Sequence, residues 1–226
     1  MRVLFNEELK AVADDLDHLV RNVRDAIHDA GRALLQQDLD VAQQVIDMDV
    51  ETDTLSASVV DQCVRLLARQ NPVATDLRVI VATLRLAITF ERMGDLARHI
   101  AEAARRTYPQ SPLPAAAQPL FAKMQDFLDI TADRLVIMLA DRDTEVAEQI
   151  IRDDDQLDNI HKQTFELALA EDWEGTRQQV VDIVLIGRFM ERLGDHAVSA
   201  SRRVVYIVSG FDPSKEPSRD EGTDID

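Results

Sequence analysis

The chain has 226 residues, of which 46% are hydrophobic and only 4% aromatic, with seven glycines and seven prolines. This composition favours packed helices over a turn-rich β fold. The net charge of −17 argues against nucleic acid or an anionic membrane as a partner, since both attract positive protein surfaces. The single cysteine, Cys63, excludes a disulfide framework and a cysteine-based zinc site.

No apolar run reaches the roughly 20 residues that span a bilayer, and the N-terminus carries no secretory signal pattern. We therefore expect an all-α protein in the cytoplasm, with no direct membrane insertion.

The first hundred residues have apolar side chains at steps of three and four, which predicts three amphipathic helices. The first begins at the capping residue Asn6 and runs to about residue 34. The second covers about 38–70 and ends before Pro72, because the residue preceding a proline disfavours helical geometry. The third begins at Thr75 or Asp76 and ends near residue 107.

Four prolines between Tyr108 and Pro119 predict a linker, after which the same order of helices returns. Three further helices are expected, at about residues 118–139, 143–172 and 175–210. The last 16 residues are polar and acidic and are expected to be disordered. The predicted units are therefore a first three-helix repeat at 1–109, a second at 118–210 and an acidic tail at 211–226.

A repeated motif accompanies the repeated helices. Glu91-Arg92-Met93-Gly94-Asp95 returns 100 positions later as Glu191-Arg192-Leu193-Gly194-Asp195. Residues 38–46 also resemble residues 143–151, at an offset of 105. A duplication of one three-helix unit, with a longer connection in the first copy, explains both offsets.

Within each repeat, carboxylates occupy positions where neighbouring turns carry apolar residues. On the third predicted helix, the apolar stripe continues into two acids: Leu77, Val81, Leu84, Ile88, then Glu91 and Asp95. On the second, the acids interrupt a stripe: Ala42, Ile46, then Asp49 and Asp53, then Val60 and Val64. The second repeat matches, with Asp154 and Asp158 before Phe165 and Leu169, and with Glu191 and Asp195 after Val180 and Val184. The pattern predicts four acidic pairs at core register.

Burying unpaired carboxylates costs several kcal/mol each. The pattern leaves three explanations open: a bound cation, pairing with Arg92 and Arg192, or a cleft open to water. Oxygen-only clusters suit magnesium, manganese and iron. His99 could extend the row of Glu91 and Asp95 by one turn. No residue set supplies a nucleophile with its base, so the sequence does not indicate an enzyme.

These features together resemble the PhoU family, the accessory and regulatory proteins of phosphate-specific transport. The resemblance rests on the duplicated Glu-Arg-x-Gly-Asp, the paired Asp-x-x-x-Asp and the segment Gln-Asn-Pro-Val-Ala-Thr-Asp-Leu-Arg at 70–78. It covers about residues 1–210. The family fold is a pair of pseudo-symmetric three-helix bundles.

The resemblance implies a metal site in each half, formed by Asp49, Asp53, Glu91 and Asp95, and by Asp154, Asp158, Glu191 and Asp195. It favours a multinuclear iron or zinc cluster over magnesium or manganese, and no organic cofactor. The two sites are expected to differ, because Gln156 and Arg152 stand where the first repeat has Glu51 and Asp47.

The resemblance also implies a function. The expected role is negative regulation of phosphate uptake and of the phosphate-starvation response when phosphate is plentiful. The expected partners are the sensor histidine kinase and the ATP-binding subunit of the phosphate ABC transporter, with the protein as a homodimer. The alternative is a carboxylate-cluster metal-binding or storage protein with enzyme-like activity.

Overall fold

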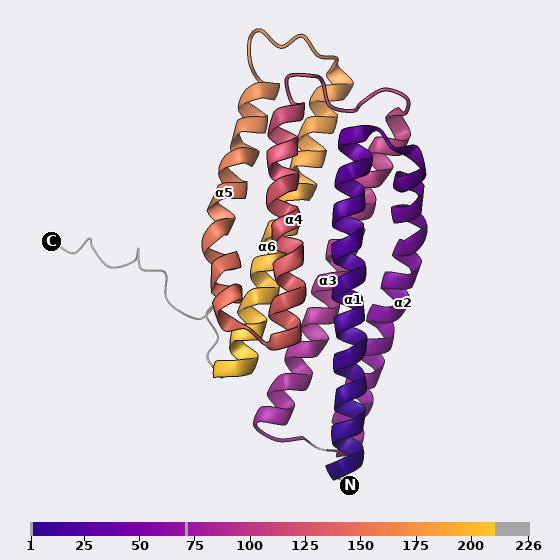
Figure 1. The fold of residues 1–226 in the computed structure, drawn as a ribbon, viewed down its shortest axis with the longest axis vertical. Helices are drawn as coiled ribbons and strands as arrows, with labels where there is room; N and C mark the ends of the chain where they lie inside the picture. Colours follow the sequence, from indigo (N-terminus) through magenta and orange to yellow (C-terminus); the bar gives the residue numbers. More distant parts are fainter. Residues whose placement is uncertain (1, 71, 211–226) are drawn as a thin grey trace, which may run out of the picture.

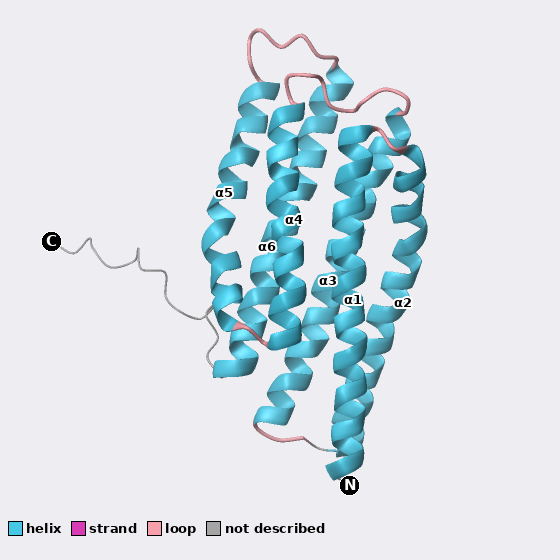
Figure 2. Cartoon of the chain, viewed as in Figure 1, coloured by secondary structure: helices cyan, strands magenta, loops and turns pink. Residues whose placement is uncertain are grey.

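The structure is a computed structural model that describes residues 2–70 and 72–210. These residues form six helices and no strand (Figures 1 and 2). The predicted all-α class is confirmed. The helices are α1 (Arg2–Gln36), α2 (Leu39–Gln70), α3 (Thr75–Thr107), α4 (Gln118–Asp141), α5 (Thr144–Ala168) and α6 (Arg177–Ser209). None of these described helices is long and apolar enough to cross a membrane.

The helix ends follow from local sequence. The Asp143 carboxylate accepts hydrogen bonds from the backbone N–H groups of Glu145 and Val146, at 2.9 and 3.1 Å, and so begins α5. Thr176 and Gln179 form a capping box at the start of α6, and Gly210 ends that helix in the left-handed conformation. Two predicted ends were wrong: α1 begins at Arg2 rather than Asn6, and α5 ends four residues before 172.

The two repeats lie side by side, with α1–α3 in one bundle and α4–α6 in the other (Figure 1). They share one hydrophobic core, because α3 packs on α6 and α1 packs on α4. Gly31 lets α1 approach α4: the Gln125 amide donates to the carbonyl of Ile27 at 3.1 Å, in the space that a side chain at residue 31 would fill. Buried Asp182 on α6 accepts a hydrogen bond from Arg106 on α3.

Independent folding of the units 1–109 and 118–210 stays a prediction, and the predicted tail at 211–226 lies outside the described residues. The shared core means that each repeat alone would expose apolar surface that the other now covers.

The apolar stripes that lead to the acidic pairs face the core only in part: Ala42 and Ala147 are fully buried, whereas other members are exposed. Leu77 is 41% exposed, Ile88 and Val64 are each 52% exposed, and Leu169 is 78% exposed. On α3 the buried side carries instead Ile80, Leu86 and Phe90 with a series of small residues, Ala82, Ala87, Ala97 and Ala101. The carboxylates therefore lie where a half-exposed helix face meets the core, not within the core itself.

Candidate functional site

The first acidic cluster consists of Asp49 and Asp53 on α2 with Glu91 and Asp95 on α3. The structure brings these four predicted residues together, since the carboxylates of Asp49, Asp53 and Asp95 all raise the pKa of Glu91. Burial is the largest cause of the raised pKa, and the charge of Arg92 lowers that pKa. Exposure is uneven, because Asp53 is exposed whereas the Asp49 side chain is only 10% exposed.

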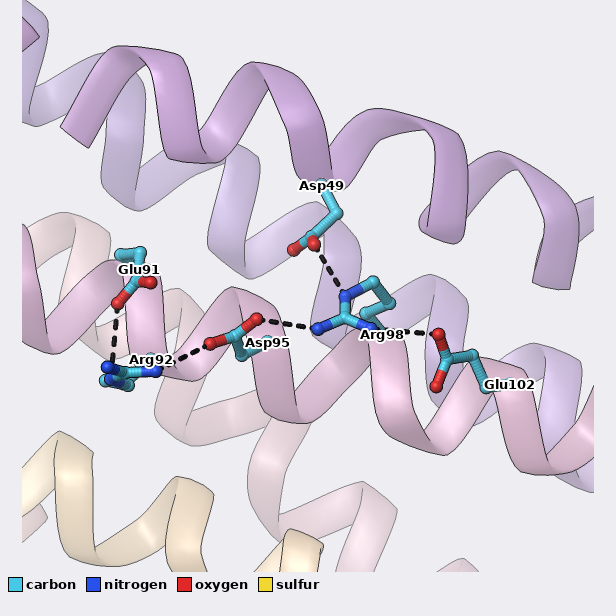
Figure 3. A network of polar contacts seen from close by, with 6 residues as sticks. All are labelled: Asp49, Glu91, Arg92, Asp95, Arg98 and Glu102. Atoms are coloured by element: carbon cyan, nitrogen blue, oxygen red, sulfur yellow. Dashed lines mark hydrogen bonds and ion pairs between the residues drawn. The ribbon is translucent and has the colours of Figure 1, made fainter. Parts of the chain in front are cut away.

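Arg98 connects the two helices of this cluster (Figure 3). Its Nε donates to Asp49 at 2.6 Å, its Nη2 to Asp95 at 2.8 Å and its Nη1 to Glu102 at 2.9 Å. Arg92 also donates to Asp95, at 3.0 Å, and lies 3.4 Å from a carboxylate oxygen of Glu91. Two arginines thus neutralise much of the first cluster.

The electrostatics of Asp49 reflect this arrangement. Burial raises the pKa of Asp49, as do the neighbouring Asp53 and Asp95, while Arg98 lowers it by charge and by hydrogen bonding. Arg98 itself was not identified from the sequence. The available signal was its spacing of three residues from Asp95 and four from Glu102, which puts the three on one helix face.

The second acidic cluster consists of Asp154 and Asp158 on α5 with Glu191 and Asp195 on α6. Its four predicted members also lie close together. Burial raises the pKa of Asp154 to about 6, helped by the charges of Asp158, Asp195 and Glu191. Among the described residues, the arginine bonded to this cluster is Arg188, whose Nη1 lies 2.5 Å from both carboxylate oxygens of Glu191.

Pairing with Arg192 was one of the three explanations left open for the acids, but within the described residues no hydrogen bond or ion pair joins Arg192 to this cluster. Burial lowers the pKa of His196, and the charges of Arg192 and Arg92 lower it further. The two repeated motifs therefore lie near each other where α3 packs on α6.

The glycine of each motif permits a close approach between helices. A Cβ on Gly194 would lie 2.6 Å from Leu157 Cδ2 and 2.7 Å from a carboxylate oxygen of Asp154. A Cβ on Gly94 would lie 3.0 Å from Thr52 Cγ2 and 3.6 Å from an oxygen of Asp49. The close approach is present in both halves, and it is tighter in the second.

Two histidines near the clusters behave differently from each other. His99 packs its ring on Phe189 of α6, with ring centroids 5.2 Å apart, so it faces the other repeat. His161 is 9% exposed, and its Nε2 is buried without a hydrogen-bond partner among the described residues. It lies three residues after Asp158 on α5.

The expected metal fits the two clusters unequally. In the first, the guanidinium of Arg98 already joins Asp49 to Asp95. In the second, the described residues supply no ion pair to Asp154, Asp158 or Asp195. As the side chains stand in the described part of the chain, no three potential ligands surround a common point.

Six helices in two repeats, with a carboxylate cluster at the same place in each, define an internally duplicated helical protein. A family model described as the PhoU domain matches residues 16–104 and 121–204. The chain belongs to the PhoU family.

Named relatives align with nearly the whole chain. The chain is 36% identical over 213 residues to a protein of Mycobacterium tuberculosis named phosphate-specific transport system accessory protein PhoU homolog 2. This alignment covers 94% of this chain and 100% of the relative. The chain is 36% identical over 216 residues to PhoU homolog 1 of Mycobacterium leprae, covering 96% of this chain and 97% of that one.

Solved structures agree on the fold. The crystal structure of PhoU from Pseudomonas aeruginosa superimposes with a TM-score of 0.83 at 28% identity, covering 92% of this chain and 100% of that one. PhoU from Streptococcus pneumoniae gives a TM-score of 0.81 at 22% identity, covering 92% and 98%, and supports the fold alone.

Proposed function

We propose that this protein restrains phosphate uptake and the phosphate-starvation response when phosphate is plentiful. It does so as a cytoplasmic adapter between the phosphate ABC transporter and its sensor histidine kinase. The observation that carries the proposal is the match to relatives named as accessory proteins of phosphate-specific transport, over 94% of this chain and the full length of one relative. The role is non-catalytic, since it requires binding of partners rather than turnover.

The charge of the chain fits partner binding. A net charge of −17 favours encounter with basic protein surfaces and makes the association rate fall with added salt. Exposed apolar residues, among them Ile88 on α3 and Leu169 at the end of α5, supply surface that a partner would cover. Self-association as a homodimer is part of the proposal and would use surface of the same kind.

A clean deletion of the gene tests the regulatory role. We expect phosphate-scavenging genes to be expressed in phosphate-rich medium and to be repressed again by the full chain. Affinity purification from phosphate-replete cells should recover the kinase and the transporter's ATP-binding subunit. Normal repression in the deletion strain, with no second copy of the gene, would contradict the proposal.

The alternative of a metal-dependent enzyme or metal store predicts a different result. The purified protein would then turn over a phosphate ester only after metal is added, and the deletion strain would keep its repression. Assaying both properties on the same preparation separates the two functions.

A further inference from the structure

Arginines are concentrated on two of the six helices. Together α3 and α6 carry eleven arginines, no lysine and seven acidic residues. The chain as a whole has the opposite balance, with 25 basic and 42 acidic residues. Because α3 and α6 pack on each other, their arginines form one locally positive region on a strongly acidic protein.

The two helices run antiparallel along this contact. Near the end of α3, Arg106 donates to Asp182 near the start of α6. Near the start of α3, the guanidinium of Arg78 lies over the ring of Tyr206 near the end of α6, 5.9 Å from its centroid. Arginines that lie between these two points on either helix therefore border the same contact.

Three such arginines are exposed to water: Arg85, Arg92 and Arg192. Arg92 and Arg192 are near each other, since after burial the charges of both lower the pKa of His196. Arg85 lies about two helical turns before Arg92 and so on the same side of α3. Arg92 remains 60% exposed although it contacts Asp95, and no ion pair to Arg85 or Arg192 is present within residues 2–70 and 72–210. We call Arg78, Arg85, Arg92 and Arg192 the arginine seam.

The acidic tail begins at one end of this seam. Gly210 ends α6 against Arg78, so closely that a Cβ on residue 210 would collide with Arg78 Nη1. Arg78 Nε is buried and has no hydrogen-bond partner among the described residues. Residues 211–226, which lie outside the described part of the chain, contain six acidic residues against only Lys215 and Arg219. A segment of net negative charge therefore starts beside the first arginine of the seam.

The tail is long enough to reach the rest of the seam. Sixteen extended residues span at most about 50 Å, whereas the 14 residues from Arg78 to Arg92 extend about 21 Å along α3. A tethered segment is also present at a millimolar effective concentration, so that several individually weak ion pairs suffice for binding. The match to the family model ends at residue 204, so the tail lies outside the part of the chain that defines the family.

We propose that the acidic tail binds the arginine seam of its own chain. The carboxylates of Asp212, Glu216, Asp220 and Glu221 pair with the guanidinium groups along α3 and α6. The bound tail covers the arginines of both repeated motifs, and an acidic segment of another protein would have to displace it to reach this face. The inference does not depend on the regulatory function proposed above.

A spin label on the tail tests whether it lies on the seam. A nitroxide is attached to Ser218→Cys in the full-length, ¹⁵N-labelled protein. Cys63 should stay unlabelled, because it is 0% exposed and burial raises the pKa of its thiol to about 11. We expect at least a twofold loss of amide signal along the seam, around residues 85–92 and 192–199, and none around Arg32 on α1. The signal should return in about 0.5 M salt, which screens exposed charges.

A variant with a neutral tail provides the control for charge. It carries Asp212→Asn, Glu216→Gln, Asp220→Asn and Glu221→Gln, and it should lose the effect of the label. Neutralising four exposed acids elsewhere should leave that effect as in the wild type: Asp61→Asn, Glu166→Gln, Glu171→Gln and Asp172→Asn. Mixing spin-labelled ¹⁴N protein with unlabelled ¹⁵N protein shows whether the tail binds a second copy instead.

A fluorescent peptide with the sequence of residues 211–226 tests the seam itself. It should bind the neutral-tail variant at least tenfold more tightly than the wild type, whose own tail competes for the seam. Adding Arg85→Gln and Arg192→Gln to that variant should weaken peptide binding by roughly tenfold. Arg32→Gln with Arg152→Gln is the matched control, because it makes the same charge change at exposed positions of α1 and α5. Circular dichroism checks that each variant is folded.

Four outcomes would overturn the proposal. The first is full amide signal along the seam in the spin-labelled wild type. The second is a loss of signal that persists in the neutral-tail variant, which would show that charge does not hold the tail. The third is a loss seen only in the mixed sample, which would make a second copy the occupant. The fourth is peptide binding that responds equally to the seam and the control arginines.

Discussion

The two halves of the molecule present the same four carboxylates on the same pair of helices, yet they balance the charge differently. In the first half, Arg98 bridges α2 and α3 through Asp49 and Asp95. In the second, buried Val198 stands at the corresponding place, and the pKa of Asp154 rises to about 6. In this chain the two copies of the motif share their carboxylates but not their counter-ions, so equal motifs do not imply equal sites.

The largest difference between the two halves should come from removing the bridge itself. Arg98→Val, in metal-free protein, leaves the partly buried carboxylate of Asp49 without its main counter-charge. We expect a loss of about 2 kcal/mol in the free energy of unfolding, measured by urea denaturation. Arg152→Val in the second half, where both members of the Arg152–Glu148 pair are at least 60% exposed, should cost less than about 0.5 kcal/mol. Equal losses would show that Arg98 is not a structural bridge.

The glycines of the two motifs should respond differently to alanine. In both helices alanine is intrinsically favoured over glycine by about 1 kcal/mol. At residue 194 the new methyl group would collide with fully buried Leu157, which has little space to move. We expect Gly194→Ala to be destabilising by about 1 kcal/mol after this compensation, and Gly94→Ala to be neutral or slightly stabilising. Thermal melts of the two variants under one buffer condition decide the point.

A smaller effect should appear on changing pH. Because the pKa of Asp154 is raised from 3.8 to about 6, the folded chain binds this proton more tightly than the unfolded chain does. The contribution of this group to stability is therefore largest below pH 3.8 and is lost as the pH rises to about 6. Burial is the largest cause of this raised pKa, and nearby negative charges raise it further: those of Asp158, Asp195, Asp155 and Glu191.

Replacing Asp154 by asparagine should remove this contribution. We compare the melting temperatures of the metal-free proteins at about pH 5 and pH 7. On this rise in pH, the melting temperature of the wild type should fall by a few degrees relative to that of Asp154→Asn. Asp53→Asn, at an exposed position of the first half, is the control and should leave the change as in the wild type. Parallel pH profiles for wild type and Asp154→Asn would contradict the prediction.

The sequence was sufficient to predict the six helices and the proximity of the four acids in each half, because strong periodicity and a repeated motif are local signals. Their role as metal ligands stays a prediction. Which face of each helix packs against the core was not predictable in the same way. On α3 two apolar series run at steps of three and four. The one that faces the core is rich in alanine, whereas the more hydrophobic Leu77 and Ile88 are exposed. Small residues are buried there because α3 must pack closely on three other helices, α1, α2 and α6.

Counter-ions were also only partly predictable. Arg92 was identified because it lies inside the repeated motif, and it does contact Glu91 and Asp95. Arg98 lies outside the motif and reaches Asp49 on another helix, 49 residues earlier in the chain. A contact between distant parts of the sequence depends on how the helices are aligned along one another. The residue spacing within one helix does not specify that alignment.

The smallest expected effect concerns the exposed stripe on α3. Ile88 is 52% exposed, and serine has a helix propensity similar to that of isoleucine, so Ile88→Ser should change the free energy of unfolding by less than about 0.5 kcal/mol. Leu86→Ser, two residues earlier and fully buried, should cost more than about 3 kcal/mol. The measurement is made at low protein concentration. Ile88→Ser could be as stable as the wild type in dilute solution but melt at a lower temperature than the wild type in concentrated solution. That result would mean that a second copy of the chain covers this stripe, because association makes stability depend on protein concentration. A large loss at every concentration would instead mean that Ile88 is buried within its own chain.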